Sequence, residues 1–205
     1  MPNRDVFVNC PFDAHYKPIF YAIVFTVIRS GFRARCALET DDAAENRLGK
    51  ICTIIDQCRY GVHDISRIEA DGTPPLPRFN MPLELGLFLG AKRYGNRPQR
   101  EKRCIVFDRE QYRYQRYISD IAGQDIHSHR GNEQTVIEEL AAWLRAQSGD
   151  RSVPGGRAIA AEYATFKAEL PTVCMARGLE IDELTFADYA DIVVQYLTID
   201  VVAPP

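Results

Sequence analysis

The sequence lacks several patterns that would place a protein in a well-defined class. It has no G-x-G-x-x-G motif, so a Rossmann-type redox site has no support. Its six cysteines form no C-x-x-C pair and do not show the Cys/His spacing of a zinc site. Basic residues are not in excess, since 25 Lys and Arg stand against 28 Asp and Glu. General binding to a nucleic-acid backbone needs a basic surface, and this composition excludes it.

Long apolar runs are also missing. The run at residues 19–28 has only the length of a buried helix, and Lys17 and Arg29 flank it. A bilayer-spanning helix needs about 20 apolar residues, so no contact with the membrane interior is predicted. Because the run is internal, it does not resemble a cleavable signal peptide. Together with unpaired cysteines in apolar patterns, this predicts a cytoplasmic protein with reduced thiols.

What the sequence does contain is a regular alternation of strand-like and helix-like segments. Four segments have the short apolar runs of strands: residues 5–9, 32–38, 59–66 and 102–108. Helical spacing of apolar residues occurs at residues 16–30, around Ile51 to Ile55, at residues 79–90 and at residues 133–146. Such alternation predicts an α/β fold with an open, mainly parallel sheet flanked by helices. Residues 109–117 interleave Arg and Tyr and predict an amphipathic helix, with stacking on a base as the alternative.

Residues 148–156 are rich in Gly, Ser and Pro and form the clearest boundary. We predict an α/β domain at residues 1–147, a linker at 148–156 and a helical extension at 157–205. Its helices are expected at residues 157–170 and 186–199, with Thr185 as the N-cap of the second. A segment of ~50 residues is too small for a secure core of its own. We therefore expect it to dock on the α/β domain or on another subunit, as in a homo-oligomer.

The most informative segment is residues 79–90, which is almost entirely apolar apart from Glu84. Asn80 is a good N-cap and Pro82 is tolerated in a first turn, so the helix is predicted to begin just before Glu84. Unpaired N–H groups and the positive end of the helix dipole should then keep Glu84 ionised at neutral pH. In the alternative interpretation, Glu84 only complements the helix dipole.

Polar residues follow the predicted strands, where ligands bind to open parallel sheets. Asn9, Cys10 and Asp13 follow the first strand and are predicted to lie near a substrate. Asp64 and Ser66 follow the third strand and are candidates to bind ribose hydroxyls. Alternatively, Asp64 caps the turn after its strand.

Further candidates come from the helix starts. Asn80 is a candidate ribose contact as well as an N-cap, and Phe12 and Tyr16 are candidates to stack on a base or to pack at the helix entry. The histidines do not suggest a metal site, because His127 and His129 lack additional ligands nearby in the sequence. His63 is predicted to be a strand residue.

The order of residues 5–11, 60–66, 80–90 and 104–108 resembles the group of nucleoside 2-deoxyribosyltransferase-like and Toll/interleukin-1 receptor (TIR) domains, including TIR-like proteins of bacterial antiphage defence. The resemblance covers about the first 145 residues and implies a flavodoxin- or TIR-like sheet. Glu84 matches the glutamate that acts at the anomeric carbon while an N-glycosidic bond breaks. Deoxyribosyltransferases carry an acidic residue shortly before this glutamate, whereas this chain has Asn80. That departure favours the TIR-like branch, whose substrate is NAD.

The resemblance implies an enzyme that cleaves the nicotinamide–ribose bond of NAD and cyclises or transfers ADP-ribose as a defence signal. NAD is then a substrate rather than a cofactor, and a partner defence effector is an expected partner. A carboxylate suits this reaction, since it stabilises the ribosyl oxocarbenium ion as its charge develops. A deoxyribosyltransferase or other nucleotide N-glycosidase, and a noncatalytic nucleotide sensor or scaffold, are the alternatives.

Overall fold

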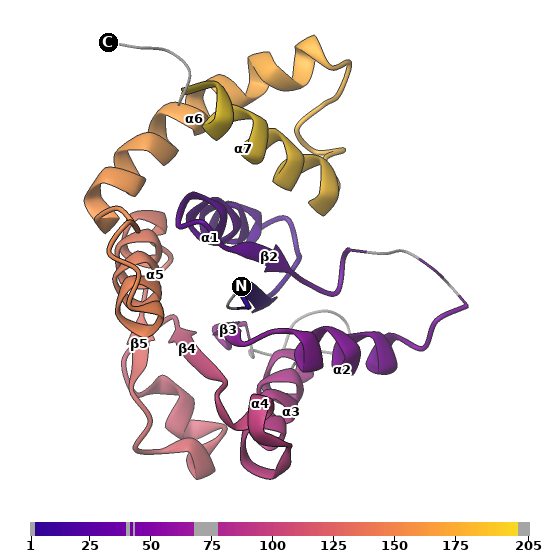
Figure 1. The fold of residues 1–205 in the computed structure, drawn as a ribbon, viewed down its shortest axis with the longest axis vertical. Helices are drawn as coiled ribbons and strands as arrows, with labels where there is room; N and C mark the ends of the chain where they lie inside the picture. Colours follow the sequence, from indigo (N-terminus) through magenta and orange to yellow (C-terminus); the bar gives the residue numbers. More distant parts are fainter. Residues whose placement is uncertain (1–2, 40–41, 43, 68–77, 201–205) are drawn as a thin grey trace.

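Five parallel strands form the centre of the protein in this computed structural model, which describes residues 3–39, 42, 44–67 and 78–200. Their spatial order is β2-β1-β3-β4-β5 (Figure 1). The bounds are β1 (Asp5–Asn9), β2 (Arg33–Arg35), β3 (Tyr60–Asp64), β4 (Arg103–Asp108) and β5 (Ile126–Ser128). This arrangement confirms the predicted α/β fold with an open parallel sheet.

Helices cover both faces of the sheet (Figure 1). One face carries α1 (Lys17–Arg29) and α5 (Glu133–Ser148), and the other carries α2 (Arg47–Gln57) and α3 (Asn80–Tyr94). The remaining elements are short α4 (Arg97–Arg100), the 3-10 turns η1 (Arg113–Arg116) and η2 (Ser119–Ile121), and the C-terminal α6 (Gly156–Ala176) and α7 (Phe186–Asp200). Among the described residues, no helix combines the length and apolar character needed to cross a bilayer.

The strands bury side chains on both faces because helices cover both. In β1, Val6 and Val8 belong to the core formed with α1 and α5, whereas Phe7 packs with α2 and with Phe88 of α3. All four side chains are fully buried. A continuous apolar run of this kind is typical of a parallel strand, and the prediction of a strand at residues 5–9 is confirmed.

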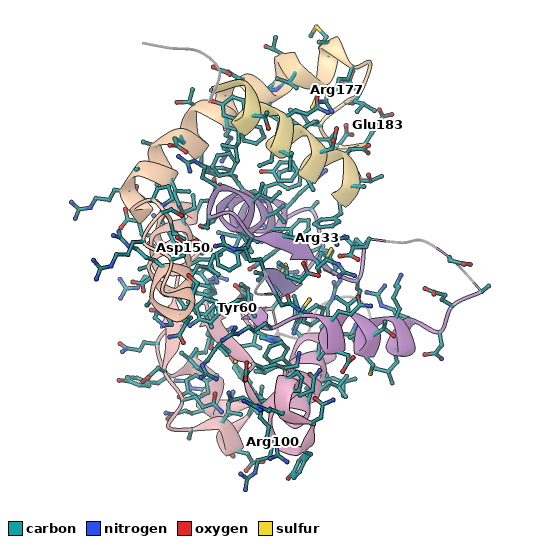
Figure 2. All side chains as sticks on the ribbon, viewed as in Figure 1. Arg33, Tyr60, Arg100, Asp150, Arg177 and Glu183 are labelled. Carbon is teal, nitrogen blue, oxygen red and sulfur yellow. The ribbon has the colours of Figure 1, made fainter. Side chains whose placement is uncertain are left out.

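The C-terminal helices share the core of the α/β domain. Phe166 of α6 packs against Phe25 of α1 with ring centroids 5.1 Å apart, and Tyr189 of α7 stacks on Tyr21 of α1 at 3.8 Å. The Tyr189 hydroxyl also donates to the backbone oxygen of Tyr21 at 3.0 Å. Figure 2 shows the side chains that fill the space between α1 and the α6–α7 pair. The extension therefore packs on α1 through one continuous core.

The approach of α6 to α5 depends on a glycine. A Cβ added to Gly156, the first residue of α6, would lie 2.5 Å from the Cα of Glu138 in α5. Gly149 ends α5 in a left-handed conformation, with φ of 69°. The predicted linker at residues 148–156 therefore contains two glycines with different roles. Gly149 allows the turn after α5, and Gly156 allows α6 to pack closely on α5.

Some elements differ from the sequence prediction. The strand expected at residues 32–38 covers only Arg33–Arg35 and pairs on one side only, with β1. The prediction of an amphipathic helix at residues 109–117 is wrong, because Tyr112 adopts a left-handed backbone, with φ of 62°, and the rest of this range contains only the 3-10 turn η1. Strand β5 and helix α4 were not predicted, since three or four residues are too few to show a period.

Candidate functional site

The sheet reverses its strand order between β1 and β3, and the predicted site residues gather at the C-terminal edge of these strands. Asn9 ends β1 and Asp64 ends β3. In the parallel register Asn9 lies opposite His63. The Asn9 side-chain nitrogen donates to the backbone oxygen of Met81 at 2.9 Å. This hydrogen bond ties the start of α3, and with it the region of Glu84, to the end of β1.

His63 lies in β3, so its prediction as a strand residue is confirmed. It is fully buried, and burial lowers its pKa to about 3, so the ring is neutral. Its Nδ1 lies 3.0 Å from the Asn9 side-chain nitrogen, which donates, so we assign the ring proton to Nε2. A Cβ at Gly61 would lie 2.7 Å from that Nε2 and 2.9 Å from the Phe88 ring. The Asn9 amide thus positions His63 and α3, and contact between Asn9 and a substrate stays a prediction.

Asp64 is fully buried and joins three loops. The Tyr16 hydroxyl donates to Asp64 Oδ2 at 2.5 Å, and the Ser66 amide donates to Oδ1 at 2.8 Å. His129 Nε2 lies 3.0 Å from Oδ2, while its Nδ1 accepts from the Gly131 amide. We therefore assign the His129 ring proton to Nε2, where it faces Asp64. These contacts favour the interpretation in which Asp64 caps the turn after β3 over the one in which it binds ribose.

A buried carboxylate also ends β4, and it too holds a neighbouring loop. The Arg113 guanidinium donates to Asp108 Oδ1 through Nε at 3.0 Å and through Nη2 at 2.5 Å. It also donates to the backbone oxygen of Ser66 at 2.6 Å. Burial raises the pKa of Asp108, while Arg113 acts in the opposite direction. Arg113 is buried in this pair, so it neutralises Asp108 and holds the loop at Ser66.

Asp13 organises the loop between β1 and α1. Its Oδ1 accepts from the Tyr16 amide at 3.1 Å. Its Oδ2 lies 3.6 Å from Arg67 Nε and 3.9 Å from Arg78 Nη1. Asp13 is therefore paired with cations from both sides of residues 68–77, which lie outside the described part of the chain. Its predicted contact with a substrate stays a prediction.

Glu84 is the fifth residue of α3 and retains 7% of its surface exposed. Its carboxylate has no hydrogen-bond partner among the residues that the structure describes. Burial raises its pKa to about 7, and Arg47 at the start of α2 acts in the opposite direction. The expectation that Glu84 is fully ionised at neutral pH is therefore wrong, because burial outweighs the helix terminus.

The start of α3 explains this correction. Phe79, not Asn80, occupies the N-cap position, and no side chain in the described part of the chain caps the helix. Asn80 is instead the first helical residue and is exposed. The Leu83 amide already donates to the backbone oxygen of Phe79 at 2.9 Å, so Glu84 lies beyond the turn whose N–H groups are unpaired. The N-cap prediction for Asn80 is wrong, and its contact with ribose stays a prediction.

Cys10 lies between the acidic residues of this edge. Its side chain is buried, and burial, followed by Asp64, raises the pKa of its thiol well above the usual value. The negative charge of Glu84 raises the pKa of the thiol in the same direction. A thiol with a raised pKa is a poor nucleophile. Cys10 therefore contributes packing at the site, and its contact with a substrate stays a prediction.

A cleft of about 540 Å³ opens beside this edge, and we call it the α1–α2 cleft. It is lined by Phe12 from the β1–α1 loop, Lys17 and Phe20 from α1, Arg47 and Lys50 from α2, and Asp182 and Thr185 from the α6–α7 loop, among others. Phe12 contacts Phe20 edge-on at 5.3 Å, so it both packs at the helix entry and faces the cleft. Glu84 does not belong to the described lining, but Arg47 does, and the charge of Arg47 lowers the pKa of Glu84.

Sequence reasoning missed Lys17 and Arg47, although a signal was present. They are the first residues of α1 and α2, where the helix dipole disfavours a cation. A basic residue at two such positions therefore suggests a role outside the helix. His129 and Asp182 could not be found in this way, because the sequence around β5 and in the α6–α7 loop shows no periodic pattern of apolar residues.

Comparison with family models, with curated proteins and with solved structures finds no match for this chain. Within the described residues, no three side chains of His, Cys, Asp or Glu lie close enough together to hold a metal ion.

Proposed function

We propose that the protein is a TIR-like nucleotide N-glycosidase that breaks the nicotinamide–ribose bond of NAD, with Glu84 as the catalytic residue. The observation that supports this most is the environment of Glu84: a buried carboxyl without a described hydrogen-bond partner, beside the point where the strand order reverses. Open parallel sheets bind ligands at such points. Strongly shifted pKa values are concentrated at functional sites, and that of Glu84 is raised to about 7.

The proposed reaction uses the ionised form of Glu84. The bond between the ribose anomeric carbon and the nicotinamide nitrogen breaks, its electron pair moves to the pyridinium ring, and neutral nicotinamide leaves. No general acid is needed, since the leaving group is already cationic. The carboxylate stabilises the oxocarbenium ion until water, a group of the same molecule or a second acceptor captures it. The product is then ADP-ribose, a cyclic form or a transferred ADP-ribosyl group.

The substrate itself favours the reactive protonation state. A pyridinium cation beside Glu84 lowers the pKa of the carboxyl, because an opposite charge stabilises the ionised form. In the free enzyme, however, the pKa of about 7 leaves a large protonated fraction at neutral pH. We therefore expect kcat/KM to rise with pH through about 7 and to level off above it. A rate that falls over this range would contradict a role for the carboxylate.

Incubation of the purified protein with NAD and a panel of nucleotides and deoxynucleosides, with products resolved by mass, tests the proposal. We expect nicotinamide release from NAD, a loss of about 100-fold or more in Glu84→Gln, and full activity in Glu101→Gln, an exposed glutamate that precedes β4 at the opposite edge of the sheet. Release of another base would instead indicate a deoxyribosyltransferase or a different nucleotide N-glycosidase. Binding of nucleotides without turnover would indicate a sensor, and full turnover by Glu84→Gln would rule out this residue.

A further inference from the structure

The C-terminal extension forms part of the wall of the α1–α2 cleft. One wall comes from the α6–α7 loop and the first turn of α7, with Asp182, Thr185 and Phe186 among the lining residues. This loop lies outside the part of the chain that resembles TIR domains. In Figure 1 the start of α7 lies beside α1 and β2. Phe186 of α7 lines the cleft together with Ala37 and Leu38, which follow β2. The extension therefore reaches the region of the candidate site.

Most of the charged residues that line the cleft, among those that the structure describes, are positive. Lys17 comes from the first turn of α1, and Arg47 and Lys50 come from the first turn of α2. Asp182 is the carboxylate among the described lining residues that opposes them. The two helices also direct their positive dipole ends toward the side of the sheet from which these residues project. Cations from two helix starts around one hollow are suited to an anionic ligand.

Lys17 connects the cleft to the extension directly. Its ammonium group donates to the backbone oxygens of Ile181 at 3.0 Å and Asp182 at 3.2 Å, and it lies 5.4 Å from the centroid of the Tyr21 ring. An ammonium group has three N–H donors, so these two carbonyls leave one for a ligand. The same side chain therefore holds the α6–α7 loop in place and contributes positive charge to the cleft.

Aromatic side chains complete the cleft. Phe12 and Phe20 belong to its lining, and Phe20 lies 6.1 Å from Phe186 of α7, measured between ring centroids. A hollow of about 540 Å³ lies within the usual range of pockets that bind small molecules. An apolar aromatic surface beside several cations matches a ligand that has a flat ring and a phosphate group.

We propose that the α1–α2 cleft binds the phosphate groups of a nucleotide through Lys17, Arg47 and Lys50, and that the α6–α7 loop is a wall of this site. The extension then has a role in ligand binding in addition to its packing on α1. The identification of the ligand as a nucleotide rests partly on the proposed function, whereas the binding of phosphate follows from the charges alone.

Calorimetric titration with ADP, inorganic pyrophosphate and adenosine tests this proposal, in the Glu84→Gln background so that no turnover interferes. We expect ADP to bind more tightly than pyrophosphate, adenosine to bind weakly, and both anions to lose affinity as salt rises. Pyrophosphate binding as tight as that of ADP would indicate a free-phosphate site and overturn the nucleotide assignment. Adenosine binding as tight as that of ADP would overturn the role of the phosphate groups.

Two substitutions that change the charge of the cleft in opposite directions test whether these residues form the binding site. Lys50→Gln should weaken ADP binding by about fivefold, whereas Asp182→Asn should strengthen it by about threefold, because one removes a cation from the cleft and the other removes an anion. Arg116→Gln, a matched loss of charge at an exposed position in η1, should change nothing. Equal Tm values would show that the variants are folded. If Asp182→Asn leaves ADP binding unchanged or weakens it, the α6–α7 loop is not part of the site.

The experiments can reject the nucleotide-binding cleft and the glycosidase activity independently of each other. ADP binding with this pattern of substitutions, in a protein that releases no nicotinamide, would retain the cleft and reject the glycosidase. Nicotinamide release by the wild type, together with ADP binding that is insensitive to Lys50 and Asp182, would retain the glycosidase and reject the cleft.

Discussion

The carboxyl of Glu84 has a pKa of about 7 because burial removes water from its charged form, while Arg47 compensates only in part. In the unfolded chain the value is near 4.5. The folded protein therefore binds a proton at Glu84 more tightly than the unfolded chain does. Between these two values, a rise in pH must lower the free energy of unfolding, by up to about 3 kcal/mol once the group is fully ionised.

This linkage predicts a stability effect that does not depend on the substrate. Glu84→Gln should raise the free energy of unfolding by about 1–3 kcal/mol at pH 8 and change it little at pH 4, because the amide carries no charge to bury. Urea denaturation of both proteins at the two pH values measures the difference. Glu110→Gln serves as the exposed control. A Glu84→Gln variant that is less stable than the wild type at pH 8 would mean that the carboxylate has a stabilising partner.

The N-terminus of α7 is capped by hydrogen bonds between Thr185 and Asp188. Thr185 and Asp188 bond reciprocally, since the Asp188 amide donates to the Thr185 hydroxyl oxygen at 3.1 Å and the Thr185 amide donates to Asp188 Oδ2 at 3.1 Å. Thr185→Ala should lower the free energy of unfolding by about 1 kcal/mol. Thermal denaturation checks this against Thr165→Ala, an exposed threonine inside α6, where little change is expected. Equal losses in both variants would contradict the capping role.

The elements also show which features could be predicted from the sequence. The strand at residues 5–9, the helix around Ile51 and the cap at Thr185 follow from local patterns, and the structure contains all three. Glu84 could be identified from the sequence because it is the only charged residue of an apolar helical segment. Its charge state could not be predicted, because it depends on burial, and burial depends on how α2 and α3 pack. The contact of His129 with Asp64 joins residues far apart in the chain, and no local pattern indicates it.

At the scale of the whole molecule, the extension and the α/β domain are expected to unfold together. Phe166 and Tyr189 are buried against α1, so removing α6 and α7 would expose the apolar surface around Phe25 and Tyr21. A chain that ends at Ser148 should therefore lose its cooperative unfolding transition and bind hydrophobic dyes, whereas the full chain should unfold in one step.

Calorimetry and light scattering after size exclusion check both chains. A shortened chain that is monomeric and unfolds cooperatively would show that the α/β domain is independent of the extension. The same measurement on the full chain tests the predicted homo-oligomer, which a monomeric mass at all concentrations would contradict.

The outermost strands of the sheet, β2 and β5, are each only three residues long. Arg33, labelled in Figure 2, is exposed on β2. Short edge strands present few backbone groups to which a strand from a neighbouring chain could add, and β2 also carries two arginines. Fibril-like growth by continuation of the sheet is therefore disfavoured, and any assembly of this protein has to use the surfaces of its helices and loops.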